Sequence, residues 1–460
     1  MKKLCPVALA LLLGVLRPSN PVYGDSVMTF VPRLSVAEEY TDNVDLDRSD
    51  RREEWTTVVS PGFDFSALWK TRGLRLSYSP GFAYAAKDQN YSEIRQDLTA
   101  YFGDQVSRRL RLSFSETLQR TELPYTLEEP VFRRSGTFGE TTVEQGQTGI
   151  SRDQEQEAFI ERRRDRTIRR NREPYTQSTT AVSADYRFGA RDRFTASYLF
   201  GVLWNDDPDV EDNRRHSPRL AVTWWPWDHY GIDAQVVYER IDYSGATDYT
   251  NDYQGQLRFL REFSEHLQGF VGYRHTVSDA ALNEDDYQVF EPFLGVDWEP
   301  SKDFFAAITV GYFYKENKVG GNDGGLTFSG DLGKSWRFRR GSIRLSGGTG
   351  YEQSYGGAEN LGFTLFYQAM AAGSYALARH VDAVASLSVV RNEYLDEDPQ
   401  RNDNVYTATA GLRYRMLRWL YLNMTYVHQR LDSNQNENVY HENRVVMSVS
   451  LMPEYGLRFK

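Results

Sequence analysis

The chain has almost no cysteine. Its 460 residues include one, Cys5, which lies in a leader-like segment at the N-terminus. If that segment is removed, the mature chain has neither a disulfide framework nor thiol chemistry. Long hydrophobic runs are also missing beyond the leader, so nothing there predicts a transmembrane helix. Lys and Arg number 54 against 64 Asp and Glu, and this acidic balance argues against a general nucleic-acid binder.

The N-terminus predicts an export signal. Two lysines precede an apolar run at residues 4–16, and a small-residue site ends at Gly24. A basic start, a short apolar core and a small-residue cleavage site are typical of secretory signal peptides. The run is shorter than the roughly 20 residues of a membrane-spanning helix, and an arginine and a proline follow it. We therefore expect residues 1–24 to be removed and residues 25–460 to form one domain.

Alternating apolar and polar residues recur along the mature chain. Between residues 74 and 84, Leu, Tyr and Phe occupy most even positions, while Arg, Ser, Gly and Ala occupy the odd ones. A period of two marks a strand with one apolar and one polar face. The sequence Ser-Pro-Gly-Phe occurs at 60–63 and at 79–82, on either side of a turn at 70–73. Antiparallel pairing would place the two Pro-Gly steps side by side, as a shared irregularity in the ladder.

The connections between the predicted strands alternate in length. Short ones lie near residues 69–73, 104–106, 189–192, 226–229, 263–266, 299–303, 337–341, 377–380 and 416–418, and long polar ones include 42–53, 205–215, 279–286, 316–324, 394–402 and 431–442. Outer-membrane barrels alternate in this way between short periplasmic turns and long outer loops, with an even number of strands. The sequence therefore predicts an all-β fold, a transmembrane antiparallel up-and-down β-barrel of about 20 strands, within a range of 16–20, in the cell outer membrane.

The tryptophans support this prediction. Seven flank proposed short turns: Trp69, Trp224, Trp225, Trp227, Trp298, Trp336 and Trp419. The other two, Trp55 and Trp204, end strands beside long loops. Girdles at membrane interfaces have this arrangement, because the indole combines an apolar body with an N–H that prefers the headgroup level.

Three segments resemble the start of a family of outer-membrane β-barrel porins. They are EEYTDNV at 38–44, WTTVVSPG at 55–62 and LSYSP at 76–80. Members of that family are often encoded with exopolysaccharide synthesis and exosortase (PEP-CTERM) systems. The resemblance implies an outer-membrane conduit, with a secreted polysaccharide and periplasmic export components as its partners. It covers the start of the mature chain, and the rest agrees with the family in its barrel pattern.

A connection near residues 123–174 is much longer than the others. Loops of such length are functional or disordered. Six arginines in its second half could bind an anionic polymer or lipopolysaccharide phosphate, at the barrel mouth or in the lumen: Arg162, Arg163, Arg164, Arg166, Arg169 and Arg170. The alternative is a solvated charged loop that binds nothing.

The alternation also predicts which charged side chains face the lumen. The candidates are Arg75, Arg109, Arg111, Arg258, Arg344, Arg413, Asp185, Asp233, Asp297 and Asp331. Charges within a membrane-spanning wall need water or a partner of opposite sign. Such residues line a pore that screens solutes by charge, or they form ion pairs that stabilise a polar interior. The two roles are compatible.

No motif predicts a catalytic, cofactor or metal site, and we expect no enzyme. Four histidines near outer strand ends, His216, His275, His428 and His441, belong to no catalytic pattern. The expected function is a conduit, surrounded by outer-membrane lipid, that assists exopolysaccharide export. A general porin for small solutes and a non-conducting structural or adhesive barrel are the alternatives.

Overall fold

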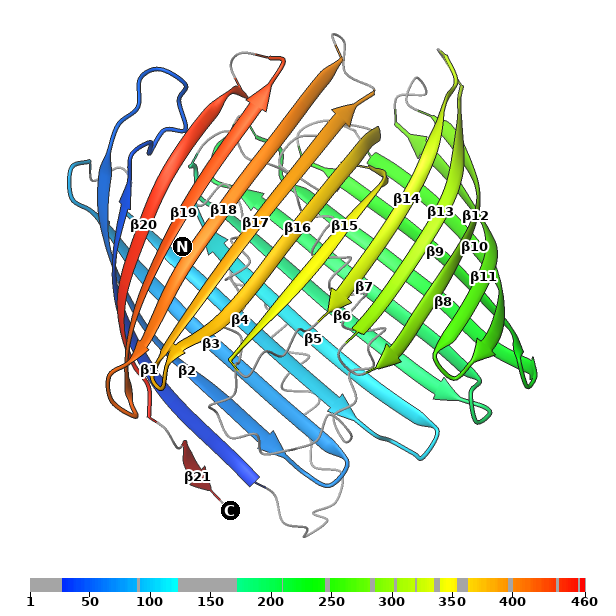
Figure 1. The fold of residues 1–460 in the computed structure, drawn as a ribbon, viewed down its shortest axis with the longest axis horizontal. Helices are drawn as coiled ribbons and strands as arrows, with labels where there is room; N and C mark the ends of the chain where they lie inside the picture. The colour runs from blue at the N-terminus through cyan, green and yellow to red at the C-terminus, as the bar shows by residue number, and fades with distance from the viewer. Residues whose placement is uncertain are drawn as a thin grey trace.

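The computed structural model is one closed antiparallel β-barrel. It describes residues 27–88, 92–122, 172–208, 210–244, 249–281, 286–301, 304–318, 321–334, 340–353, 363–395, 400–435, 438–453 and 456–459. In this part of the chain, no helix has the length and apolarity to cross a membrane. Within these ranges, twenty long strands pair in chain order, and the last pairs with the first; Figure 1 shows the closed barrel. The predicted barrel is confirmed, whereas the predicted signal peptide lies outside the described residues.

The long strands have 12 to 16 residues each. They are β1 (Val27–Thr41), β2 (Glu54–Leu68), β3 (Arg72–Ala85), β4 (Glu93–Asp104), β5 (Leu110–Thr121), β6 (Tyr175–Arg187), β7 (Arg193–Asn205), β8 (Asn213–Trp227), β9 (Tyr230–Tyr243), β10 (Tyr249–Ser264), β11 (Leu267–Ala280), β12 (Tyr287–Ser301), β13 (Phe304–Asn317), β14 (Asp323–Lys334), β15 (Gly341–Gln353), β16 (Phe363–Ala378), β17 (Val381–Tyr394), β18 (Arg401–Arg415), β19 (Leu420–Ser433) and β20 (Tyr440–Leu451). The short β21 (Leu457–Phe459) continues the line of β20 and pairs with the start of β1.

The predicted alternation of connections is confirmed. Long connections gather at one end of the barrel and short turns at the other (Figure 1). We call these the long-loop end and the short-turn end. The repeated Ser-Pro-Gly steps also lie opposite one another. The β2–β3 ladder pairs Val59 with Phe82 and Phe63 with Tyr78, and it is interrupted between these two pairs, where the two steps face each other. Proline has no N–H to give to a ladder, so the two steps share one irregularity.

The two faces of the wall differ in chemistry. Large apolar side chains project outward, such as Val236, Val271 and Leu294, whose exposed fractions are 60%, 59% and 61%. Residues of the other parity carry the charged and hydroxyl groups and point to the lumen. Asp233, for example, lies between the outward Ile232 and Ala234 and binds polar groups of both neighbouring strands. This is the arrangement of a barrel with lipid outside and water inside.

The connection between β1 and β2 folds back over the long-loop end of the wall. Leu46 is 5% exposed and packs with Val405, Leu431 and Tyr440, which belong to β18, β19 and β20. Its φ of 57° lies in the left-handed region, which is costly for a residue with a branched side chain. The buried contact holds Leu46 in that conformation, so this connection is a packed element of the mouth.

One seam of the wall is weaker than the rest. β14 and β15 pair only between Phe328–Leu332 and Leu345–Thr349. On its other side, β14 pairs with β13 over its whole length, and β15 does the same with β16. Beyond this stretch, the residues at both ends of the two strands are not paired across the seam.

Candidate functional site at the mouth of the barrel

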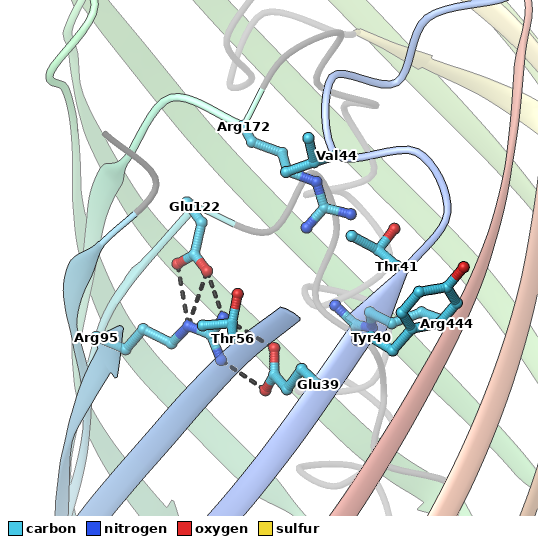
Figure 2. A pocket seen from close by; sticks show the side chains of 9 residues that line it. All are labelled: Glu39, Tyr40, Thr41, Val44, Thr56, Arg95, Glu122, Arg172 and Arg444. Carbon is cyan, nitrogen blue, oxygen red and sulfur yellow. Dashed lines mark hydrogen bonds and ion pairs between the residues drawn. The ribbon is translucent and has the colours of Figure 1, made fainter. Parts of the chain in front are cut away.

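A charged cluster surrounds a small cavity at the long-loop end of the lumen. The cavity measures ≈ 20 Å³, room for about one or two water molecules. Its lining, drawn in Figure 2, comes from both ends of the barrel sequence and from both ends of the longest connection: Glu39, Tyr40, Thr41, Val44, Thr56, Arg95, Glu122, Arg172 and Arg444.

Arg95 holds two carboxylates at once. Its two terminal nitrogens donate to the two oxygens of Glu39 at 2.7 and 2.9 Å, and its Nε donates to Glu122 Oε1 at 2.9 Å. Figure 2 shows the guanidinium between the two acids. All three side chains are mostly buried. A planar guanidinium is suited to paired hydrogen bonds of this kind, which are stronger than bonds between neutral groups. Arg95 thereby fixes the residue after β5 to the first strand.

Arg172 makes the corresponding anchor at the other end of the longest connection. Its guanidinium binds Glu442 on β20, and Glu442 also accepts a hydrogen bond of 2.7 Å from Thr41 Oγ1. The Arg172 and Glu442 side chains are 7% and 1% exposed. Tyr175, three residues later, is already paired between β5 and β7. The chain before β6 therefore reaches from that side of the mouth to the strand that closes the barrel.

The motif behind the family resemblance occupies this closure. Thr41 binds Glu442, Asp42 binds Asn443, and the Asn43 side chain donates to the carbonyl oxygen of His441 at 2.8 Å. These bonds join the end of β1 to the start of β20. The sequence alone indicated the resemblance, but it did not reveal this structural role.

The cluster combines three acids with three bases. Arg95 takes two of the carboxylates and Arg172 takes the third, whereas Arg444 is 4% exposed and bonds to no carboxylate of the described residues. The Nε atoms of Arg172 and Arg444 are both buried without a hydrogen-bond partner in the described part of the chain. The cluster is thus balanced in charge but not fully satisfied in hydrogen bonds.

An exposed ion pair lies on the rim outside the strands. Lys87 holds the pKa of the Glu53 carboxyl below its usual value, through a hydrogen bond and through its charge. The hydroxyl of Tyr40 also donates to Glu53, at 3.3 Å, and lowers the same pKa further. The rim acid is therefore ionised at neutral pH.

Several predicted lumen residues bond to neighbouring strands. Asp185 accepts from Arg193 Nε at 2.9 Å, and Asp233 accepts from Arg258 Nε at 3.0 Å. Arg111 donates to the Tyr101 hydroxyl at 3.0 Å. The wall between β4 and β10 thus carries polar bonds between neighbouring strands.

The remaining predicted lumen residues are placed differently. Arg413 donates to Asn423 Oδ1 at 3.2 Å, and Arg75 and Arg344 are exposed on lumen-facing positions of β3 and β15. Asp297 has the lumen-facing parity of β12. Arg109 lies in the turn before β5, not on a strand, because β5 begins at Leu110. The side chain of Asp331 lies outside the described residues. The structure spreads these residues around the wall and does not gather them into one site.

The other sequence candidates are the loop arginines and the histidines. The loop arginines Arg162, Arg163, Arg164, Arg166, Arg169 and Arg170 lie outside the described residues. His216 bonds to the Tyr198 hydroxyl at 2.6 Å, and His428 contacts Asn443 Oδ1 at 2.9 Å. Across the described ranges, no three His, Cys, Asp or Glu side chains gather as a metal site.

Sequence reasoning missed the pairing of Glu39, Arg95 and Glu122. Their positions in the strands predict an inward direction for Glu39 and Arg95. Alternation reveals which face a residue occupies, but Arg95 reaches Glu39 across the two intervening strands β2 and β3. No local pattern in the sequence indicates that Arg95 and Glu39 meet across these two strands.

The fold is that of an outer-membrane β-barrel. Residues 357–452, which include β16 to β20, match the family described as "Putative beta-barrel porin 2". The resemblance to a family of outer-membrane β-barrel porins is thereby confirmed, from the opposite end of the chain to the segments that first indicated it. The match carries no association with exopolysaccharide. A comparison with curated proteins yields no match.

Solved structures of similar architecture are distant. OccK2 (OpdF) of Pseudomonas aeruginosa is 10% identical, over 92% of this chain and 98% of that chain, with a TM-score of 0.38. The FrpB iron transporter of Neisseria meningitidis is 11% identical over 92% and 82%, with a TM-score of 0.49. The siderophore receptor PirA of Acinetobacter baumannii is 8% identical over 92% and 80%, with a TM-score of 0.47.

Proposed function

We propose that the protein is a conduit for hydrophilic solutes in the outer membrane, and that hydroxyl-rich saccharide chains are the solutes its lumen suits best. The observation that carries this proposal is the series of cross-strand ion pairs on the inner wall. They join β6 to β7, β8 to β9, β9 to β10 and β11 to β12: Arg193–Asp185, Arg215–Glu239, Arg258–Asp233 and Arg274–Glu291.

Pairing changes what a charged wall does to a passing solute. A guanidinium beside a carboxylate cancels much of the field that either group would exert across a lumen, and salt screens the remainder beyond about 8–10 Å. Both groups keep hydrogen-bonding capacity that a hydroxyl can use, since it donates and accepts. A ring of like charges would instead select ions. A paired wall therefore favours polar solutes of low charge.

The resemblance at the start of the chain supports an exopolysaccharide as the natural solute. It also supports partners in the periplasm, which would dock at the short-turn end. The apolar outer face is suited to the lipid of the outer membrane, and the fold family supports a channel rather than an enzyme. A general porin for small solutes and a closed structural or adhesive barrel are the competing functions.

Conductance in planar bilayers separates these functions. We expect open channels with a reversal potential near zero in a salt gradient, because the wall charges are paired. Neutral oligosaccharides added to one side should cause brief blockades. Replacing one pair by Asp233→Leu with Arg258→Leu should shorten the blockades, whereas Leu257→Val on the outward face of β10 should leave them unchanged.

Each result bears on one part of the proposal. A barrel without conductance would favour the structural or adhesive function. Conductance with strong ion selectivity and no blockade by saccharides would favour a general porin. Loss of the gene should shift polysaccharide from the released to the cell-bound fraction if export is the natural role, and an unchanged distribution would contradict that role.

A further inference from the structure

The β14–β15 seam leaves part of two strands without a ladder. Above Phe328 and Thr349, residues 323–327 of β14 and 350–353 of β15 make no backbone pairs with each other. Unpaired backbone groups are costly in hydrocarbon, where no water can replace the missing bonds. The wall is therefore least stable at this seam.

The sequences of the two strands weaken the seam further. β14 and β15 are rich in glycine, at positions Gly324, Gly325, Gly330, Gly333, Gly341, Gly347, Gly348 and Gly350. Glycine offers no side chain for packing between neighbouring strands and loses more backbone freedom than other residues when it is ordered. Both strands consequently gain little from staying paired.

The long-loop end of β15 lies on the lumen side of the neighbouring wall. Tyr351 has the same parity as Ile343 and Leu345, whose side chains are exposed on the outer face. Yet its hydroxyl donates to Glu291 Oε2 at 3.1 Å, and its ring lies 5.4 Å from that of Phe313. Glu291 and Phe313 both have the lumen-facing parity of their strands. The outer row of β15 thus packs against the inner row of β12 and β13, and the two parts of the wall overlap.

Side chains seal this overlap in place of backbone bonds. The aromatic rings of Tyr351 and Phe363 stack with centroids 5.1 Å apart, and Phe363 packs with Phe313, Tyr287 and Val289 in a buried apolar cluster. On the lumen side, Glu291 also accepts hydrogen bonds of 2.9 Å from Arg274 and from Thr327. An apolar seal therefore lies directly beside a polar lumen wall.

We propose that the β14–β15 seam is a lateral opening, through which a molecule with an acyl chain moves between the lumen and the membrane. The polar part of such a molecule would contact Glu291 and Arg274, while its chain would take the place of the aromatic cluster between the strands. Leu326, 75% exposed on the outer face of β14, marks where the chain would meet hydrocarbon. A fully polar solute would not enter the hydrocarbon through this opening. The lateral opening is therefore a function beyond the conduit proposed above.

Cysteine pairs can lock the seam, because the chain's one natural cysteine, Cys5, lies in the predicted signal peptide. Ser329→Cys with Gly348→Cys joins directly opposed residues of β14 and β15. The matched control is Ser342→Cys with Ser374→Cys, which joins β15 to the fully paired β16, where the two hydroxyl oxygens are 2.9 Å apart. Neither pair includes a residue of the aromatic cluster.

The probe is a phospholipid with a photoreactive acyl chain, in vesicles that contain the reconstituted full-length protein. We expect acyl adducts on peptides containing Tyr351 and Phe363 when the seam is reduced, and their loss when the seam disulfide forms. The control disulfide should leave the adducts unchanged. Labelling of Leu326 should persist throughout, because that residue faces lipid in every state.

A single substitution gives an independent measurement if a cysteine pair fails to assemble. Tyr351→Phe removes the hydrogen bond to Glu291 but keeps the ring, so it should raise labelling of Phe363 several-fold. The proposal would be overturned if the aromatic cluster is not labelled in any variant, or if its labelling does not change when the seam disulfide forms. Conductance is measured on the same samples and should persist in the locked protein, so failure of the opening and failure of the conduit are distinguishable.

Discussion

Asp42 accepts two hydrogen bonds from Asn443, one from its backbone N–H and one from its side-chain amide, each at 2.7 Å. With Thr41–Glu442 and Asn43–His441, this contact joins the end of the first strand to the start of the last. The Thr-Asp-Asn segment therefore has a physical role in a porin-like barrel without any chemistry of its own. It closes the wall at the mouth, where the ladder between β1 and β20 ends.

The closure predicts a specific loss of stability. Asp42→Ala should lower the free energy of unfolding by about 1–3 kcal/mol, because it removes hydrogen bonds to an ionised acceptor. The measurement is urea unfolding in lipid vesicles, followed by the gel shift of the folded barrel. Asp50→Ala is the control, since Asp50 is exposed in the same connection and, among the described residues, its hydrogen bond to Asp47 comes from its backbone N–H. An equal loss in both variants would count against a closing role for Asp42.

The buried ion pairs predict a larger effect. Arg95→Met should cost about 3–5 kcal/mol, because it leaves Glu39 and Glu122 mostly buried without the cation that hydrogen-bonds to both. Adding Glu39→Gln and Glu122→Gln should restore much of the loss. Arg75→Met is the matched control, since Arg75 faces the lumen but is exposed there. The same unfolding measurement applies, and absence of rescue in the triple variant would mean that charge burial is not the cause.

The outer face predicts a penalty that alternates along one strand. Val449 is 43% exposed on the outer face of β20, whereas Ser448 points inward and accepts a hydrogen bond of 3.2 Å from Asn423. Val449→Arg should destabilise the barrel by about 2–4 kcal/mol, the cost of a cation near the bilayer midplane. Ser448→Arg should be tolerated, because its charge reaches water in the lumen. The folded fraction in vesicles measures both, and similar damage at the two positions would contradict a single lipid face.

The two ends of the barrel predict opposite accessibility. Asn322 lies at the long-loop end and Arg340 at the short-turn end. In the outer membrane, Asn322→Cys should react with a membrane-impermeant maleimide on intact cells, and Arg340→Cys should react only after lysis. Reversed labelling would mean that the long-loop end, with the charged cluster, faces the periplasm.

Much of the wall could be predicted from the sequence, because its signals are local. A period of two predicts the face of Asp233, and turn spacing predicts the number of strands. Where a residue finds its partner is not a local property. Arg172 reaches β20 from the far side of the mouth, and the pairing of β14 with β15 stops at Phe328, although both strands continue. The first residues of β1 pair with β2 and also with β21, which lies far away in sequence.

The Thr41–Glu442 bond spans 401 positions of the sequence, so it belongs to the last events of assembly. Contacts of such separation form slowly, because the intervening chain must be ordered before they give any stability. Until then β1 and β20 are open edges, ready to pair with any other strand they meet. A chain truncated before β20 would keep an open strand edge, and would stay prone to aggregation and proteolysis even if β1 to β19 had folded. The polar bonds at the mouth therefore form only in a barrel whose first and last strands already lie side by side.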